Sequence, residues 1–229
     1  IVTGGAKRLG REIALSLAAL GYSIALHYST TKPDGVAQEI RASGVECEPF
    51  QCDFSGVTEV EGFVEKVLGR FPSLELLINN ASVFERSTIE ETSLEFLERH
   101  LTINFTVPFI LSRDFKRHVG KGHIINITDT NVTKNFSTYA AYLLSKKALS
   151  EFTRMAAREF APETRVNAVA PGLILPPDGE GEEYTKRLSE RIPLKRAGEP
   201  ADIASAIEFL VNNDFVTGEI LFIDGGRHL

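Results

Sequence analysis

The chain has 229 residues, of which 43% are hydrophobic and 24% are charged. This length and composition predict one large α/β domain with a well-buried core. The net charge of −6 and the isoelectric point near 5.5 argue against a nucleic-acid partner or an anionic membrane surface, because both need a basic counter-surface. No apolar run approaches the roughly 20 residues that span a bilayer and no signal peptide is visible, so we expect a cytoplasmic protein.

The chain opens at Ile1 inside a predicted strand, so we expect a few residues of that strand to precede it. The two cysteines, Cys47 and Cys52, have no histidine partners at metal-ligand spacing. We therefore expect buried thiols in a reducing compartment and no metal site.

Short apolar runs alternate with longer helical patterns, which predicts a parallel sheet with helices on both faces. We expect seven strands, at 1–3, 23–27, 46–51, 74–79, 123–128, 164–170 and 219–223. The first helix repeats Ile13, Leu17 and Leu20 and ends at Gly21; further helices are expected at 34–43, 58–70, 94–118, 139–160 and 200–212. Residues 1–229 are thus predicted to form a single Rossmann-type, doubly wound domain.

Residues 171–183 interrupt this regularity after the sixth predicted strand. They combine Pro176 and Pro177 with three glycines and four acidic residues, and a helix is expected at 182–191. Irregular segments at the carboxyl edge of a sheet often cover a binding site. We therefore predict that residues 173–191 form a mobile lid over the substrate.

Residues 3–10, Thr-Gly-Gly-Ala-Lys-Arg-Leu-Gly, join the first predicted strand to the first helix. Glycines there let the backbone approach a dinucleotide pyrophosphate at the helix N-terminus. A glycine-rich turn is weak evidence alone, and its position between strand and helix strengthens it. Cofactor contacts are predicted for Gly4, Lys7, Arg8, Leu9 and Gly10.

The end of the second strand bears on the choice of cofactor. An NAD enzyme places a carboxylate here for the ribose hydroxyls, whereas this strand ends in His27 followed by Ser29 and Thr30, with no acid to repel a 2′-phosphate. Lys7 and Arg8 are either solvated cations or phosphate ligands, and an anion would relieve their unfavourable placement at a helix N-terminus. The pattern favours NADPH, with contacts from His27, Ser29 and Thr30.

Tyr142 and Lys146 lie four residues apart on a predicted helix and share one face. A unit charge about 4 Å from the phenol, at an effective dielectric of roughly 20, is worth about 4 kcal/mol or three pK units. We therefore expect Lys146 to lower the pKa of Tyr142 and make it a proton donor. An ionised Asp129 would oppose this, so the two acids are expected to titrate together. Tyr139, a competing phenol, is expected to pack.

Together the motifs resemble the short-chain dehydrogenase/reductase family over essentially the whole chain. The matching residues are the 3–10 turn, Asp53, Asn79, Asn80, Ala81, Asn104, Tyr142, Lys146, Pro171 and Gly172. Two positions depart from the usual pattern, where Arg8 replaces a glycine and Asp129 replaces a serine. Both departures, with Ser82, Phe84 and the C-terminal residues 224–229, resemble the pteridine reductase and dihydromonapterin reductase branch.

The resemblance implies a role for each matching cofactor residue. Asp53 would hold the adenine amino group, unless it only caps the next helix. Asn80 and Ala81 would line the adenosine ribose and the nearby wall. Further cofactor contacts are implied for Ser82, Tyr142, Lys146, Pro171, Gly172 and Ile174.

The reacting residues are implied in the same way. Lys146 would bond the nicotinamide ribose, and Asn104 would support a water relay to it. Phe84 would stack on a pterin ring, unless it packs in the core. Ser82 would contact the cofactor phosphate or the pterin edge, and Arg8 would reach both the pyrophosphate and the pterin. The family also implies a homotetramer.

Asp129 discriminates between substrates, unless it is a capping aspartate at the strand end. An ionised carboxylate cannot donate to a ketone oxygen and would repel a developing alkoxide. A dihydropterin instead needs a proton at a ring nitrogen and presents N–H donors to a carboxylate. We therefore predict NADPH-dependent reduction of 7,8-dihydromonapterin or a related dihydropterin by Asp129, Tyr142, Lys146 and Asn104, with dihydrofolate as a secondary substrate.

Two alternatives remain open at this point. One is a carbonyl reductase of the 3-oxoacyl thioester class, and the other is a regulator that binds NADPH without turnover. The sequence leaves open which pterin is preferred, and the roles of Arg227 and His228.

Overall fold

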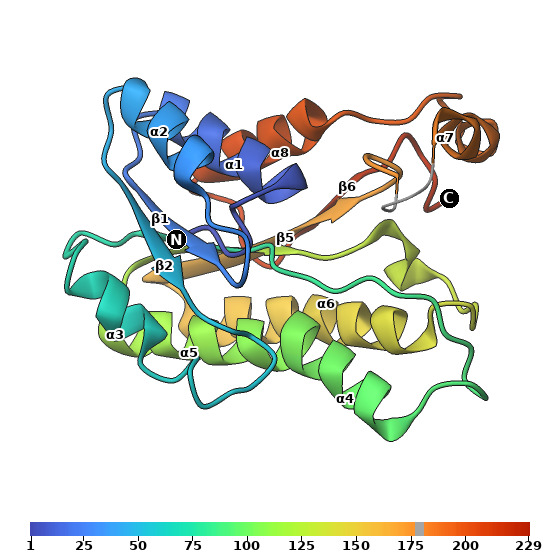
Figure 1. The fold of residues 1–229 in the computed structure, drawn as a ribbon, viewed down its shortest axis with the longest axis horizontal. Helices are drawn as coiled ribbons and strands as arrows, with labels where there is room; N and C mark the ends of the chain where they lie inside the picture. Colours follow the sequence, from blue (N-terminus) through green and yellow to red (C-terminus); the bar gives the residue numbers. More distant parts are fainter. Residues whose placement is uncertain (177–180) are drawn as a thin grey trace.

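A computed structural model describes residues 1–176 and 181–229 and places a parallel sheet between two helical layers (Figure 1). The strands pair in the order β2-β1 and β3-β4-β5-β6, and the single residue Val2 bridges β1 to β3 through Leu26 and Ile78. Their bounds are Ile24–Tyr28 for β1, Cys47–Gln51 for β2, Leu76–Asn79 for β3, Gly122–Ile127 for β4, Thr164–Pro171 for β5 and Ile220–Ile223 for β6. This crossover pattern is that of a doubly wound fold.

The expectation of seven strands is wrong for residues 1–3, which contribute one bridging residue. The backbone of Val2 bonds Ala25 and His27, while Thr3 donates to the Ile78 carbonyl. The turn begins at Thr3, and Gly4 follows in the left-handed region with φ of 63°. The ladder therefore ends before a second residue of this segment can pair with either strand.

Helices cover both faces of the sheet (Figure 1). One face carries α1 (Arg8–Ala19), α2 (Asp34–Ala42) and α8 (Pro200–Asn212), and the other carries α3 (Phe63–Leu68), α4 (Leu94–Leu101), α5 (Val107–His118) and α6 (Ala140–Phe160). The remaining helix, α7 (Glu182–Ser189), lies near the C-terminus beyond β6.

Two helices differ from their predicted extents. Residues 54–62 form turns and bends, and α3 begins only after Gly62, whose φ of 83° does not fit a helix. The predicted helix 94–118 is divided by a π-helical turn, Thr102–Thr106, between α4 and α5. Such turns often occur at functional sites, and this one carries Asn104.

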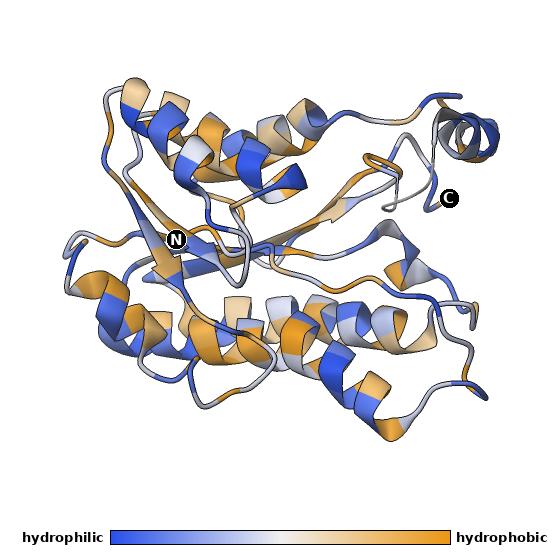
Figure 2. Cartoon of the chain, viewed as in Figure 1, coloured by the Kyte–Doolittle hydropathy of each residue, from blue (hydrophilic) through white to orange (hydrophobic). Residues whose placement is uncertain are grey.

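Hydrophobic residues recur along the strands and along the helices of both layers (Figure 2), and buried apolar side chains form a cluster on each face of the sheet. Leu77 and Ile124 pack in the core on one side, whereas Ile78 and Ile125 pack on the other. This alternation follows from the two-residue period of a strand, and burial on both faces explains the near-continuous apolar strands.

The two cysteines are free and buried, as predicted. Burial raises the pKa of the Cys47 and Cys52 thiols to about 11, so neither is an activated nucleophile. Among the helices of residues 1–176 and 181–229, none combines the length and the apolar character that a membrane span requires.

Candidate active site

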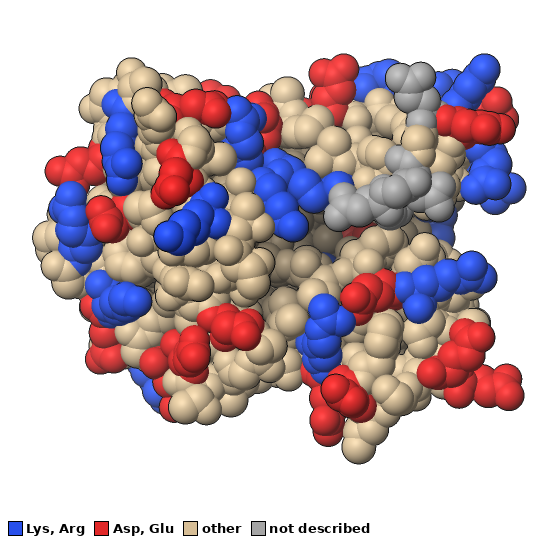
Figure 3. Space-filling model, in the orientation of Figure 1, with Lys and Arg blue, Asp and Glu red and all other residues tan. Residues whose placement is uncertain are grey.

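A cavity of about 790 Å³ opens along the carboxyl ends of the strands, where open α/β sheets bind their ligands. Figure 3 shows this face hollowed, with basic side chains beside the hollow. The structure brings every predicted site residue except Asn104 to its wall. The lining set includes Gly4, Lys7, Arg8, Leu9, Gly10, His27, Ser29, Thr30, Asp53, Asn80, Ala81, Ser82, Phe84, Asp129, Tyr142, Lys146, Pro171, Gly172 and Ile174.

The turn after Val2 is held by its own hydrogen bonds. Thr3 Oγ1 accepts from the backbone N–H of Asn80 at 2.8 Å and of Ala81 at 2.9 Å, while Asn80 Nδ2 donates to the Thr3 carbonyl at 2.8 Å. A Cβ on Gly10 would stand 2.1 Å from the Gly4 carbonyl oxygen. Glycine at position 10 is therefore required by packing.

His27 supports this turn and does not offer a free nitrogen to a ligand. Its Nδ1 accepts from the Gly4 N–H at 2.9 Å, its Nε2 lies 3.0 Å from the Cys52 carbonyl, and its ring stacks on Phe54 at 3.9 Å. These partners specify the neutral tautomer with the proton on Nε2. Burial lowers the pKa of His27 to about 4. Both ring nitrogens are therefore engaged within the protein, and the predicted contact of His27 with the cofactor stays a prediction.

Arg8 is strained and spans the cavity. It is the first residue of α1, has a left-handed φ of 52°, and donates from Nη2 to the Pro176 carbonyl at 2.7 Å. The contact joins the nucleotide-binding turn to the predicted lid. Of that lid, Leu173, Ile174, Leu175, Tyr184 and Leu188 line the cavity; residues 177–180, including Pro177, lie outside the described part.

Asp53 lies at the same end of the cavity. Its carboxylate accepts from the Ser55 backbone N–H at 2.9 Å and the Ser55 hydroxyl at 2.8 Å, and these bonds lower the pKa of Asp53. The alternative that it caps the next helix is wrong, because α3 has Gly62 at its N-cap. Its predicted adenine contact stays a prediction.

The reacting end centres on a hydrogen-bonded pair of acids. Tyr142, in the first turn of α6, donates its hydroxyl to Asp129 Oδ2 at 2.9 Å. The other oxygen, Oδ1, accepts from the Asn131 backbone N–H at 2.7 Å and from Asn131 Nδ2 at 2.8 Å. Asp129 also caps the short 3₁₀ helix Thr130–Thr133, so it is both a capping residue and a wall of the cavity.

The pKa of Tyr142 moves opposite to the expected direction. Burial raises it well above 10, and the charge of Asp129 and the hydrogen bond between them add to the rise. Burial also raises the pKa of Asp129, although the two Asn131 bonds, the Tyr142 bond and the charge of Lys146 act against it. The phenol therefore keeps its proton and shares it with the carboxylate.

Lys146 lies behind this pair, fully buried in α6. Its Nζ donates to the Ile127 carbonyl at 2.8 Å and lies 5.9 Å from the centroid of the Tyr142 ring. Burial lowers the pKa of Lys146 to about 8. Burial thus disfavours the charged form of Lys146, and burial of Tyr142 itself is the largest influence on the pKa of the phenol.

Asn104 connects the cavity wall to α6. Its Oδ1 accepts from the Val83 N–H at 2.9 Å and the Ser82 hydroxyl at 3.1 Å, and its Nδ2 donates to Ser145 Oγ at 3.0 Å. It is fully buried and does not line the cavity itself. The water relay from Asn104 to Lys146 stays a prediction. Ser82 helps to orient Asn104, because its hydroxyl donates to Asn104 Oδ1.

Aromatic rings form the wall beside Tyr142. The Phe84 ring stacks on Tyr139 with centroids 4.6 Å apart and meets the Tyr142 ring edge-on at 4.7 Å. Phe84 is 45% exposed, so the core-packing alternative is wrong. Tyr139 packs as predicted, and it also lines the cavity.

Sequence reasoning missed several residues of the site. Asn131 could have been found, because Asp-Thr-Asn after a strand is typical of an Asx turn in which the aspartate accepts from the residue two positions on. Arg99, paired with Glu85 at 2.5 Å, and Tyr184 carry no such local signal. Arg227 lines the cavity of its own chain, and Lys134 Nζ bonds its carbonyl at 2.7 Å.

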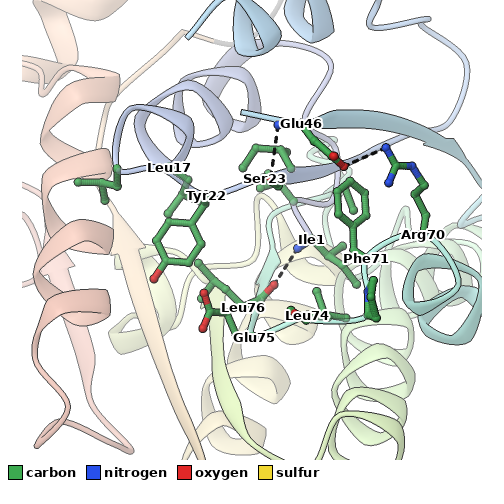
Figure 4. A pocket seen from close by; sticks show the side chains of 17 residues that line it. Ile1, Leu17, Tyr22, Ser23, Glu46, Arg70, Phe71, Leu74, Glu75 and Leu76 are labelled. Carbon is green, nitrogen blue, oxygen red and sulfur yellow. Dashed lines mark hydrogen bonds and ion pairs between the residues drawn. The ribbon is translucent and has the colours of Figure 1, made fainter. Parts of the chain in front are cut away.

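A second cavity, of about 610 Å³, lies at the amino ends of β1 and β3 (Figure 4). Glu46 and Arg70 form an ion pair of 2.9 Å at its rim, and the Glu46 N–H donates to Ser23 Oγ at 3.3 Å. No residue of the predicted site lines it. The chemistry therefore gathers at the carboxyl edge of the sheet.

The fold, the nucleotide-binding turn and the acid pair define a nucleotide-dependent oxidoreductase. Residues 4–228 match the family model described as enoyl-(acyl carrier protein) reductase. The chain is 33% identical to dihydromonapterin reductase of Citrobacter koseri over 236 residues, covering 100% of this chain and 96% of that protein. It is 32% identical to 3-oxoacyl-(acyl-carrier-protein) reductase FabG of Staphylococcus epidermidis, covering 100% and 98%.

A solved structure shows the same fold. FolM alternative dihydrofolate reductase 1 from Brucella suis, in complex with NADP, superposes with a TM-score of 0.94 at 33% identity, covering 99% of this chain and 93% of that one. The chain therefore belongs to the short-chain dehydrogenase/reductase family, as its motifs indicated, and is a short-chain oxidoreductase.

Proposed function

We propose that this protein is an NADPH-dependent reductase of dihydropterins, with 7,8-dihydromonapterin or a related pteridine as substrate and dihydrofolate as a secondary one. The observation that carries the proposal is the 2.9 Å hydrogen bond from Tyr142 to Asp129. It places a carboxylate where a ketone reductase needs a hydroxyl donor. The relatives named for dihydromonapterin and dihydrofolate reduction support the same substrate class.

The cavity fits a dinucleotide. The turn at Gly4 and Gly10 is packed so closely that no Cβ fits at position 10, which leaves the backbone at the cavity wall unobstructed. Lys7, Arg8 and the hydroxyls of Ser29 and Thr30 line the same end and suit a 2′-phosphate. The FolM structures complexed with NADP support this choice. When bound, the reduced nicotinamide supplies the hydride.

The chain's own residues would supply the proton and orient the ring. Tyr142 and Asp129 hold one proton between buried oxygens, beside the Phe84 ring. The carboxylate accepts an N–H of the pterin, and the pair releases its proton to N5 as C6 is reduced. A proton from solvent then restores the pair. Lys146, whose pKa is lowered to about 8 by burial, would orient the nicotinamide ribose.

The FabG relatives favour a second candidate, reduction of a 3-oxoacyl thioester. An ionised Asp129 disfavours it, because a carboxylate repels the alkoxide that forms at a reduced ketone. A regulator without turnover is disfavoured by the complete set of Tyr142, Lys146 and Asn104 around one cavity.

A substrate panel followed at 340 nm tests the proposal. The purified protein is mixed with NADPH and with dihydromonapterin, dihydrobiopterin, dihydrofolate or acetoacetyl thioester. We expect turnover with the dihydropterins, and strongly reduced pterin turnover with unchanged NADPH affinity in Asp129→Ser. Turnover of the thioester alone would overturn the proposal. Titration with NADH should give a much weaker affinity than with NADPH.

We also propose a homotetramer assembled through α4, α5 and α6. Leu94 on α4, Phe109 on α5 and Leu144 and Met155 on α6 are 70%, 42%, 54% and 70% exposed, and an interface between subunits would bury this apolar surface. Light scattering after size-exclusion chromatography would give about four times the mass of one chain, and a monomer would contradict the assembly.

A further inference from the structure

Asn131 makes contacts that neither the family motifs nor the proposed reaction assign. Its side-chain amide and its backbone N–H both donate to Asp129 Oδ1, at 2.8 Å and 2.7 Å. The remaining oxygen, Oδ2, accepts the Tyr142 hydroxyl at 2.9 Å. The two oxygens of the carboxylate therefore have separate partners, and the division follows from Asn131.

The amide of Asn131 is held in one orientation by this contact. Its Nδ2 must face the carboxylate, because the flipped amide would place its oxygen against Oδ1. In this orientation Asn131 Oδ1 is buried without a hydrogen-bond partner among the residues the structure describes. A buried acceptor without a partner destabilises the fold. The orientation of the Asn131 amide is therefore better explained by its hydrogen bond to Asp129 than by a contribution to stability.

We propose that Asn131 is a positioning residue that fixes Asp129 Oδ1 and so reserves Oδ2 for the proton of Tyr142. The role as part of the proton donor rests on the function proposed above, whereas the effect of Asn131 on Asp129 does not. The backbone bond belongs to the Asx turn and is kept by every residue at 131 except proline, which has no N–H to donate. The side-chain bond alone is removed by mutation, which makes the role separable from the fold.

Other groups around Asp129 set the background for this effect. Tyr142 and Lys146 reach it from α6, and Lys146 supplies the electrostatic attraction that favours the carboxylate. Further charged or titratable groups on the cavity wall are Lys7, Arg8, His27, Tyr28, Asp53, Arg99, Tyr139, Tyr184 and Arg227. A substitution at 131 changes none of these groups. A shift in the pKa of Asp129 would therefore measure the loss of the hydrogen bond from the Asn131 side chain.

Infrared spectroscopy of the free protein tests the proposal without a substrate. The stretch of the protonated carboxyl of Asp129, identified by its absence in Asp129→Asn, is followed against pH. In Asn131→Leu, which is nearly isosteric, the band should appear at a pH roughly one unit higher, because a hydrogen bond to the charged form is lost. In Asn131→Asp the shift should be larger, since a second carboxylate is added beside the first.

A matched control is Asn135→Leu. Asn135 is exposed, accepts from Lys147 Nζ at 2.9 Å and does not line the cavity, so its loss should leave the band in place. An unchanged midpoint in both Asn131 variants overturns the proposal. If either variant fails to fold, the other still decides it.

Kinetics give a second readout. With dihydropterin, Asn131→Leu should lower kcat roughly tenfold and leave the NADPH affinity unchanged, because only the geometry of the proton donor is altered. An unchanged kcat would contradict the catalytic part of the proposal. If the unaltered protein turns over no dihydropterin, the proposed function fails, and the infrared titration still decides the role of Asn131.

Discussion

The two halves of the active-site cavity are built differently. In the nucleotide half, Thr3, Asn80 and His27 bond backbone groups of the turn or of the strand ends, and their polar atoms serve the architecture. In the reacting half, Tyr142 and Lys146 are buried and Asp129 is half-buried, and all three have pKa values shifted by burial and by one another. In the nucleotide half, hydrogen bonds fix the backbone of the turn. In the reacting half, ionisable side chains are placed where burial of a charge is costly.

This difference predicts a division of mutational effects. Substitutions in the nucleotide half should lower stability and cofactor affinity together, because the turn and the fold share the same bonds. Substitutions in the reacting half should lower turnover while the cofactor still binds.

Tyr142→Phe should have the largest effect. The variant removes the hydroxyl that bonds Asp129, and kcat for dihydropterin reduction should fall at least about a hundredfold, with NADPH affinity changed less than about threefold. Stopped-flow absorbance at 340 nm and a fluorescence titration give the two quantities. A variant that keeps more than a tenth of the activity would show that Tyr142 is not the proton donor.

Acidification should destabilise the nucleotide half through His27. Its pKa is about 4 in the folded protein against 6.5 unfolded, so the unfolded chain binds the proton more readily and stability falls between pH 6.5 and 4. The loss is about 3 kcal/mol, and it should be absent in His27→Gln. Denaturant unfolding at several pH values measures it. His123, with a pKa of about 3, contributes to both proteins and cancels in the comparison.

Gly10→Ala should destabilise by about 3 kcal/mol, because its Cβ would meet the Gly4 carbonyl at 2.1 Å and Asn80 Nδ2 at 2.6 Å. NADPH affinity should fall with it. The matched control is Gly35→Ala on exposed helix α2, where no atom lies within 4 Å and where alanine should stabilise by about 0.5 kcal/mol. Thermal unfolding with and without NADPH decides; equal effects at both positions would contradict the close packing of the turn.

Thr3→Val should cost about 2 kcal/mol, because the backbone N–H groups of Asn80 and Ala81 lose their acceptor. Thr3→Ser keeps the hydroxyl and should cost less than about 1 kcal/mol. Chemical denaturation measures both. If valine and serine behave alike, the hydroxyl does not hold the turn.

Much of this site could be predicted from residue spacing. The order of strands and helices, the position of the turn at 3–10, and the meeting of Asp129 with Tyr142 all follow from periodicity and motif. The length of α3 could not be predicted, because the left-handed Gly62 that delays its start reads in the sequence as one more helix residue. The π-turn around Asn104 likewise leaves the apolar pattern of 94–118 nearly unbroken.

The electrostatics could not be predicted from spacing. The sequence places Lys146 one turn from Tyr142, but the ammonium is drawn to the Ile127 carbonyl and both groups are fully buried. Desolvation then outweighs the attraction between charge and phenol, and the pKa of Tyr142 rises. The contacts of Asn131 likewise depend on the position of Asp129 in three dimensions, which spacing along the sequence does not give.

The left-handed backbone at Arg8 favours glycine for folding, whereas the proposed function favours arginine. The position is locally frustrated in this sense. A left-handed φ costs a non-glycine residue about 1 kcal/mol, so Arg8→Gly should fold to a slightly more stable protein. The same change removes a guanidinium from the cavity wall and its bond to the Pro176 carbonyl. Under the proposed function, a selection for thermal stability alone would therefore favour glycine at this residue, whereas a selection for turnover would retain Arg8 and its strained backbone.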